Sequence, residues 1–131
     1  MEAALGFYVD LLGFQIKVNE IERGPYIATV TGVPEAVIHI VKATLQDHWM
    51  IELLEYKSHP DIPRAMPKLR DIGHAHIALT VDNLSAEYER LKSAGVSFNS
   101  VPQPSPNGYA LVAFCQDPEG NFVELVEVLH R

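Results

Sequence analysis

A short motif occurs twice in this chain, once near the middle and once near the end. Residues 51–55 read Ile-Glu-Leu-Leu-Glu and residues 123–127 read Val-Glu-Leu-Val-Glu. Each copy is typical of a β-strand that carries a carboxylate among apolar residues. A buried carboxylate is costly unless it is paired or binds a metal. Two such strands in one chain predict a pseudo-symmetric site built from two halves.

The sequence similarity between the two halves extends beyond this motif. Residues 7–14 and 88–95 each read as the end of an amphipathic helix that stops at a glycine, Gly13 or Gly95. Repeats of half a chain are too long and too few for a solenoid, so we expect a duplicated βαβββ module. His76 lies 19 positions before Gly95, and the equivalent position in the first half would precede Met1. The first strand of module one is therefore expected to be missing.

We expect one domain over residues 1–131, with module one at 1–58, a linker at 59–71 and module two at 72–131. Three prolines between positions 59 and 67 favour the linker. The remaining expected features are strands at 14–19, 36–42, 48–56, 74–81, 96–99, 109–115 and 122–129, an irregular stretch at 21–34, a helix from Asp82 or Asn83 to Gly95, and a proline-rich loop at 102–108.

Composition excludes several classes of function. The net charge of −7 argues against a nucleic-acid or anionic-membrane surface. The sequence shows no run of 18 apolar residues and no signal peptide, so we expect no membrane partner and a cytoplasmic protein. The single cysteine, Cys115, cannot form an internal disulfide and reads as a buried, inert thiol in a reducing compartment.

Alternation along the strands assigns side chains to faces. Apolar odd-numbered residues take the helix side of the strands, so the even-numbered Glu52, His76 and Glu124 take the opposite side. If both modules curl around one cavity, these three side chains point into it, between apolar walls that suit a small molecule. His74 and Met50 lie on the same faces and are candidate substrate contacts. His39 reads as a wall residue, and Glu55 and Glu127 are expected to reach solvent.

Four segments together resemble the vicinal oxygen chelate superfamily, which includes glyoxalase I, epimerases, extradiol dioxygenases and bleomycin resistance proteins. They are Phe-Tyr-Val-Asp-Leu-Leu-Gly-Phe at 7–14, Ile-Glu-Leu-Leu-Glu-Tyr at 51–56, Gly-His-Ala-His-Ile-Ala-Leu-Thr-Val-Asp at 73–82, and Asp-Pro-Glu-Gly-Asn-Phe-Val-Glu-Leu at 117–125. The resemblance implies the α+β fold of that family, in which paired βαβββ modules form a curved mixed sheet around a metal site in a cavity.

The resemblance also implies a ligand set. By position, Glu52, His76 and Glu124 match three of the family's four metal ligands, and the fourth, a histidine on the first strand, has no match. The implied cofactor is a divalent metal (Zn, Ni, Co, Mn or Fe). Glu124 is the expected base that removes a proton next to a carbonyl, with Glu52 as its counterpart.

These residues lead to three alternative functions. The first is a metal-dependent lyase, isomerase or epimerase of the glyoxalase type, which acts on a small carbonyl substrate through an enediolate. The second is an Fe-dependent extradiol-type dioxygenase, and the third is a metal-free small-molecule binding or resistance protein. We also expect a homodimer, because a missing strand would leave a sheet edge exposed.

Overall fold

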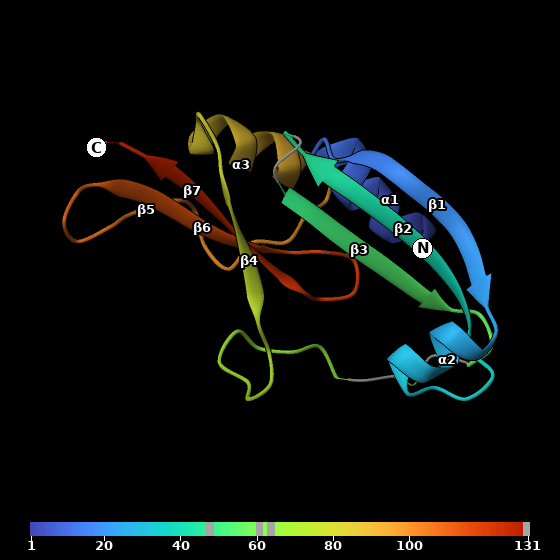
Figure 1. The fold of residues 1–131 in the computed structure, drawn as a ribbon. Helices are drawn as coiled ribbons and strands as arrows, with labels where there is room; N and C mark the ends of the chain where they lie inside the picture. The colour runs from blue at the N-terminus through green and yellow to red at the C-terminus, as the bar shows by residue number, and fades with distance from the viewer. Residues whose placement is uncertain (47–48, 60–61, 63–64, 130–131) are drawn as a thin grey trace. The chain divides into compact units, whose positions relative to one another are not determined.

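The structure, a computed structural model, describes residues 1–46, 49–59, 62 and 65–129. The chain divides into two compact units, Met1–Arg64 and Ala65–Arg131, whose elements are drawn in Figure 1. Their boundary falls within the predicted linker. His48, expected to begin a strand, and His130 lie outside the described residues.

The first unit holds three helical segments and an antiparallel sheet of order β1-β2-β3 (Figure 1). Its elements are α1 (Glu2–Leu5), the π-helix η1 (Gly6–Leu11), β1 (Gln15–Arg23), α2 (Pro25–Thr31), β2 (Val37–Leu45) and β3 (Trp49–Tyr56). The pairing of β1 with β2 has an irregularity between Ile16 and Val18, where the register shifts. The first and last strands of this sheet are its edges.

The π-helical turns change which side chains the first helix buries. Ala4, Tyr8 and Leu11 are spaced to share one face of a regular α-helix, yet the buried residues are the neighbours Phe7 and Tyr8. The amide of Leu12 donates to the carbonyl of Phe7, which is the wide turn of a π-helix. This widening brings two consecutive aromatic side chains toward the core.

The stretch expected to be irregular at 21–34 is mostly ordered, so that prediction was wrong. β1 continues to Arg23, and α2 begins directly after Gly24 with Pro25 in its first turn. Proline at this position fixes φ near its helical value and removes an amide that would have no helical partner. Ile27 of α2 then packs in a small core with Ala36, Ile38 and Ile40.

The second unit is a mixed sheet of order β4-β7-β6-β5 with one helix (Figure 1). Its elements are β4 (His76–Thr80), α3 (Leu84–Ser93), β5 (Gln103–Pro104), β6 (Ala110–Gln116) and β7 (Phe122–Val128). β4 runs parallel to β7, whereas β6 is antiparallel to β7 and to β5. The predicted α+β class with a mixed sheet is confirmed.

Two strand predictions in this unit need correction. The expected strand at 96–99 is reduced to one isolated bridge between Phe98 and Cys115. The short β5 forms instead inside the predicted proline-rich loop, where Gln103 pairs with Val112. Proline is tolerated there because β5 is an edge strand, which needs fewer backbone donors.

One face of the second sheet is covered by α3. Leu84 and Leu91 of the helix and Val123 and Leu125 of β7 are almost completely buried. Asn83 caps the helix by accepting a hydrogen bond from the amide of Ala86 at 2.9 Å. Cys115 lies in the same core, and burial raises the pKa of its thiol to about 11.

Glu127 was expected to reach solvent, and it does so only in part, because one of its oxygens is bound at the start of α3. Its Oε2 accepts a hydrogen bond from the backbone amide of Leu84 at 2.7 Å. The first amides of a helix have no partner within the helix, and a carboxylate there is also favoured by the helix dipole. The last strand thus fixes the start of α3.

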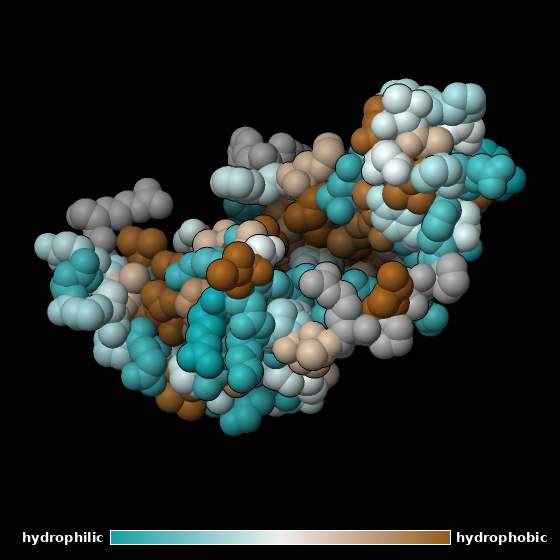
Figure 2. All heavy atoms as spheres, turned by 90° about the horizontal axis from the view of Figure 1, so that it is seen from below, coloured by the Kyte–Doolittle hydropathy of each residue, from teal (hydrophilic) through white to brown (hydrophobic). Residues whose placement is uncertain are grey.

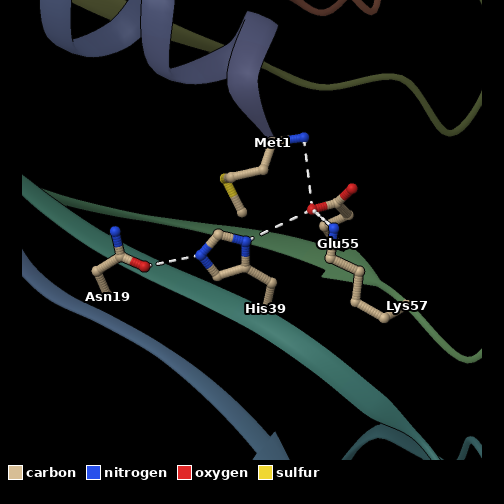
Figure 3. A network of polar contacts seen from close by, with 5 residues as sticks. All are labelled: Met1, Asn19, His39, Glu55 and Lys57. Atoms are coloured by element: carbon tan, nitrogen blue, oxygen red, sulfur yellow. Dashed lines mark hydrogen bonds and ion pairs between the residues drawn. The ribbon is translucent and has the colours of Figure 1, made fainter.

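Glu55 was also expected in solvent, but it is the centre of a polar network in the first unit (Figure 3). Its Oε2 lies 2.8 Å from Lys57 Nζ, 3.5 Å from His39 Nδ1 and 3.7 Å from the amino group of Met1. His39 Nε2 lies 2.7 Å from Oδ1 of Asn19 and donates to it. The hydrogen bond from Lys57 lowers the pKa of Glu55, partial burial opposes this, and the amino terminus and His39 lower it further.

No helix in the part of the chain that the structure describes is both long and apolar enough to cross a membrane.

Replacement of Gly120 tests the packing of the segment before β4. Gly120 has φ +88°, and a Cβ there would lie 2.7 Å from Met66 Cε and 3.1 Å from Pro67 Cδ. We expect Gly120→Ala to lower the free energy of unfolding by about 1–2 kcal/mol. Most of this is backbone strain, with a smaller part from Pro67, because the exposed tip of Met66 can move aside. Chemical denaturation measures the change.

Gly108→Ala is the matched control, because Gly108 has φ +74° and open space around it. It should cost only the backbone strain, about 1 kcal/mol. Addition of Met66→Ala to Gly120→Ala should recover part of the difference. Equal losses at Gly120 and Gly108 would show that Met66 and Pro67 do not constrain the turn.

Removal of the ammonium at Lys57 should weaken the pH dependence of stability. Because the folded pKa of Glu55 is lowered, its ionisation stabilises the fold above the unfolded pKa, and this contribution is lost as pH falls through the folded pKa. The free energy of unfolding should therefore fall less in Lys57→Gln than in the parent protein between about pH 7 and about pH 3. The difference between the two falls should be less than about 1 kcal/mol. Lys68→Gln makes the same charge change in the second unit and should leave this difference unaltered. An unchanged difference in Lys57→Gln would contradict the assigned role of Lys57.

Candidate active site on the second sheet

His76 and Glu124 meet on the face of the second sheet that turns away from α3. Parallel pairing of β4 with β7 puts His76 opposite Phe122 and Ala78 opposite Glu124. The two side chains are thus diagonal neighbours, and His76 Nε2 lies 3.2 Å from Glu124 Oε2. Glu127, three residues along β7, points to the helix side, where it bonds Leu84. Alternation along one strand therefore separates the two carboxylates.

Phe114 completes the immediate surroundings of this pair. It lies opposite Glu124 on β6, and its ring packs edge-on against His76 with centroids 5.1 Å apart. The side chains of His76 and Glu124 are 39% and 23% exposed, so both can reach a ligand. An imidazole and a carboxylate in contact, beside an aromatic ring, are able to exchange a proton with a bound molecule.

The geometry of the pair fits two ligands of one divalent metal. Metal–nitrogen and metal–oxygen bonds of about 2.1 Å would place two donors about 3.2 Å apart at an angle of about 100°. The observed separation of 3.2 Å between Nε2 and Oε2 is compatible with this spacing, and it is also the length of a direct hydrogen bond between the two side chains. In the described ranges, no group of three or more His, Cys, Asp or Glu residues gathers as a metal site. The structure therefore supplies two donors here.

The sequence predicted that His74 lies on a strand. In the structure it lies in the segment before β4. Its ring packs edge-on against Phe122 with centroids 5.4 Å apart. Its Nε2 is buried and has no hydrogen-bond partner among the described residues. Strand pairing begins only at His76, after Gly73 with φ +83°. A direct contact between His74 and substrate stays a prediction.

Glu52 and Met50 lie on β3, in the first unit, on the same face of that strand. Met50 is 61% exposed. Glu52 lies directly opposite Lys42 on β2, and Lys42 Nζ is 3.5 Å from Glu52 Oε1. This ammonium was missed from the sequence, because only the register shows which residue of β2 is opposite Glu52. The prediction that Glu52 joins His76 and Glu124 at one metal stays a prediction.

Comparison with known proteins gives the chain a family. The family model of the Glyoxalase/Bleomycin resistance protein/Dioxygenase superfamily matches residues 1–125. The lactoylglutathione lyase of Salmonella typhimurium is 27% identical over 131 residues, which cover 97% of this chain and 84% of that protein.

Solved structures share the fold. A glyoxalase family protein from Bacillus cereus has a TM-score of 0.89 at 20% identity and covers 99% of this chain and 87% of its own. TnmS3, an antibiotic binding protein from Streptomyces sp. CB03234, has a TM-score of 0.59 at 23% identity, with 97% of this chain and 85% of its own covered. Since the family model spans nearly the whole sequence, this chain belongs to the Glyoxalase/Bleomycin resistance protein/Dioxygenase superfamily.

Proposed function

We propose that this protein is a metal-dependent lyase or isomerase of the glyoxalase type that acts on a small carbonyl substrate. The observation that carries the proposal is the contact between His76 Nε2 and Glu124 Oε2 at 3.2 Å on an accessible face. Relatives named lactoylglutathione lyase, which align over 97% of the chain, support the choice within the superfamily.

In this proposal Glu124 is the general base. Its carboxylate removes the proton from the hydroxyl-bearing carbon next to the substrate carbonyl and returns it to the former carbonyl carbon. The hydroxyl proton passes to the former carbonyl oxygen, so the hydroxyl and carbonyl groups exchange places with no net gain or loss of atoms. In the structure His76 Nε2 lies next to one carboxylate oxygen, Oε2. These two atoms are the ones that would hold a metal, which leaves the other carboxylate oxygen to take up the proton. Phe114 restricts the imidazole by packing against its ring.

A divalent metal held by His76 and Glu124 would polarise the substrate oxygens and stabilise negative charge that develops on them. Glu52 is proposed as a further ligand and as the counterpart base in the first unit. The position of Lys42 favours the role of base over that of ligand. Its ammonium lies 3.5 Å from Glu52 Oε1 and opposes the binding of a metal cation at the same oxygen.

Turnover and metal content of matched variants test the proposal. With Zn, Ni, Co, Mn or Fe added in turn, the protein should isomerise the hemithioacetal of methylglyoxal and glutathione, or that of a simpler thiol, to the thioester. Glu124→Gln should lower kcat by about 10²–10⁴-fold, because the proton acceptor is lost while the size of the side chain is kept. His76→Ala should also lose bound metal, as measured by elemental analysis.

Glu52→Gln and Lys42→Gln separate the two roles of Glu52. If Glu52 is a ligand, Glu52→Gln lowers metal affinity and Lys42→Gln raises it. If Glu52 acts only as a base, metal affinity is unchanged in both variants. Unchanged metal content in His76→Ala, or consumption of dioxygen with catechols in place of isomerisation, would overturn the proposed function.

A metal-free binding protein is the second candidate. His76 and Glu124 contact each other directly, so the pair is satisfied without a metal. The similarity in fold to the antibiotic binding protein TnmS3 is consistent with such a use. Tight binding of a small apolar molecule by metal-free protein, with no turnover for any added metal, would favour this candidate.

We also propose that the protein is a cytoplasmic homodimer. β3 is an edge strand of the first sheet, and its Trp49 and Met50 are 70% and 61% exposed. An apolar edge strand favours pairing with another chain, and a twofold dimer would bury the same surface on both copies. Figure 2 shows hydrophobic side chains at the molecular surface. The one thiol, Cys115, suits a reducing compartment.

Light scattering at about micromolar concentration, typical for stable dimers, should give twice the chain mass. Trp49→Lys should shift the protein toward monomer, because a lysine on an edge strand blocks pairing. Tyr26→Lys is the control, since Tyr26 is as exposed, at 68%, but lies on α2. A monomeric parent protein, or equal effects of the two variants, would contradict the β3 interface.

A further inference from the structure

The face of the second sheet around the candidate pair carries no charge beyond His76 and Glu124 among the described strand residues. Strand register identifies the neighbours on this face by pairing. They are Ala78 and Thr80 on β4, Phe122 and Val126 on β7, and Val112 and Phe114 on β6. Every one of them is uncharged, and two are aromatic.

The helix cations of this unit are not on that face. α3 packs against the opposite side of the sheet, as the bond from Leu84 to Glu127 shows. Arg90 donates to Glu87 at 2.6 Å, and Lys92 donates to the hydroxyl of Tyr88 at 3.0 Å. A negatively charged group that settled over the pair would therefore find no helix ammonium or guanidinium beside it.

This distribution of charge has a consequence for ligand choice. Away from the metal that the proposed function puts at the pair, a substituent that carries a carboxylate or phosphate would lie over apolar side chains. It would lose its water there without gaining a cation from the strands or the helix of this unit, which is costly. Glu124 would also repel it. A neutral apolar group gains affinity instead, about fourfold for each methylene that is removed from water. Aromatic groups gain further from edge-to-face contacts like the one between Phe114 and His76.

We propose that the second sheet selects a carbonyl substrate whose substituent next to the reacting carbon is neutral and apolar, with an aromatic ring preferred. Phe114 is the specificity-determining residue, since it lies opposite Glu124 and touches His76. The inference rests on the proposed function and narrows its substrate class. A glutathione conjugate, the kind of compound in the name of the lyase relatives, carries two carboxylates. It would bind only with both of them held away from this face.

Equilibrium binding of three α-hydroxyketones tests the inference without any need for turnover. The probes are hydroxyacetone, 2-hydroxyacetophenone and 4-(2-hydroxyacetyl)benzoate, which keep the two adjacent oxygens and vary the substituent. NMR titration of the intact protein gives the dissociation constants. We expect 2-hydroxyacetophenone to bind about tenfold more tightly than either of the other two, as burial of one ring predicts.

Phe114→Ala should weaken binding of 2-hydroxyacetophenone about tenfold and change hydroxyacetone less than about twofold. Phe114→Leu should retain part of the preference. Tyr109→Ala is the matched aromatic control, because Tyr109 is 59% exposed just before β6 and should leave all three constants unchanged. The ring-proton signals of His76 should shift in Phe114→Leu, since the aromatic ring beside the imidazole is lost, and should stay in place in Tyr109→Ala.

Three results would overturn the inference: equal or tighter binding of the benzoate probe, equal weakening of all three probes in Phe114→Ala, or no binding of any probe. If the proposed isomerase activity fails but the preference and its dependence on Phe114 hold, the proposed function is wrong and the ligand class stands. If isomerase turnover is found without the preference for 2-hydroxyacetophenone, the proposed function stands and the inferred ligand class is wrong.

Discussion

The parallel pairing of β4 with β7 is the constraint on which the candidate site depends. It sets His76 opposite Phe122, so that the imidazole reaches Glu124 diagonally across the two strands. Because successive side chains alternate between faces, a slip of β7 by one residue would turn Glu124 toward α3, while His76 on β4 would stay on the open face. The apolar face of β7, with Val123 and Leu125 buried, resists such a slip. Packing of the core therefore holds the register on which the polar pair depends.

The same alternation gives the last strand two roles. Glu124 faces the open side and Glu127 faces the helix, where it accepts from the amide of Leu84. The repeated Glu-x-x-Glu spacing thus places one carboxylate of the second unit beside His76 and the other at the start of α3. In the first unit the equivalent residues are Glu52, paired with Lys42, and Glu55, paired with Lys57. In both units a nearby donor compensates the second carboxylate of the motif.

Much of this could be predicted from the sequence, because period-two alternation and glycine stops are local signals. They identified the helix that precedes Gly95, whose Leu84, Tyr88 and Leu91 are buried, and the two faces of β7. They failed where one residue type fits two structures. The stretch at 21–34 was expected to be irregular, but its Gly24 and Pro25 also suit a helix start and form one here. The positions of Lys42 and Phe114 depend on which residues lie opposite each other between strands, which a single sequence does not reveal.

The buried thiol of Cys115 has a practical consequence. It is the only cysteine of the chain and lies in the core beneath α3, with a pKa of about 11. Its thiolate is therefore scarce at neutral pH and out of reach of reagents in the folded state. Reaction with a thiol reagent must wait until the second unit opens, so the rate of modification reports local unfolding of that unit alone. Modification of Cys115 can therefore be used to measure opening of the second unit. A cysteine introduced at the surface could be labelled selectively while Cys115 is kept.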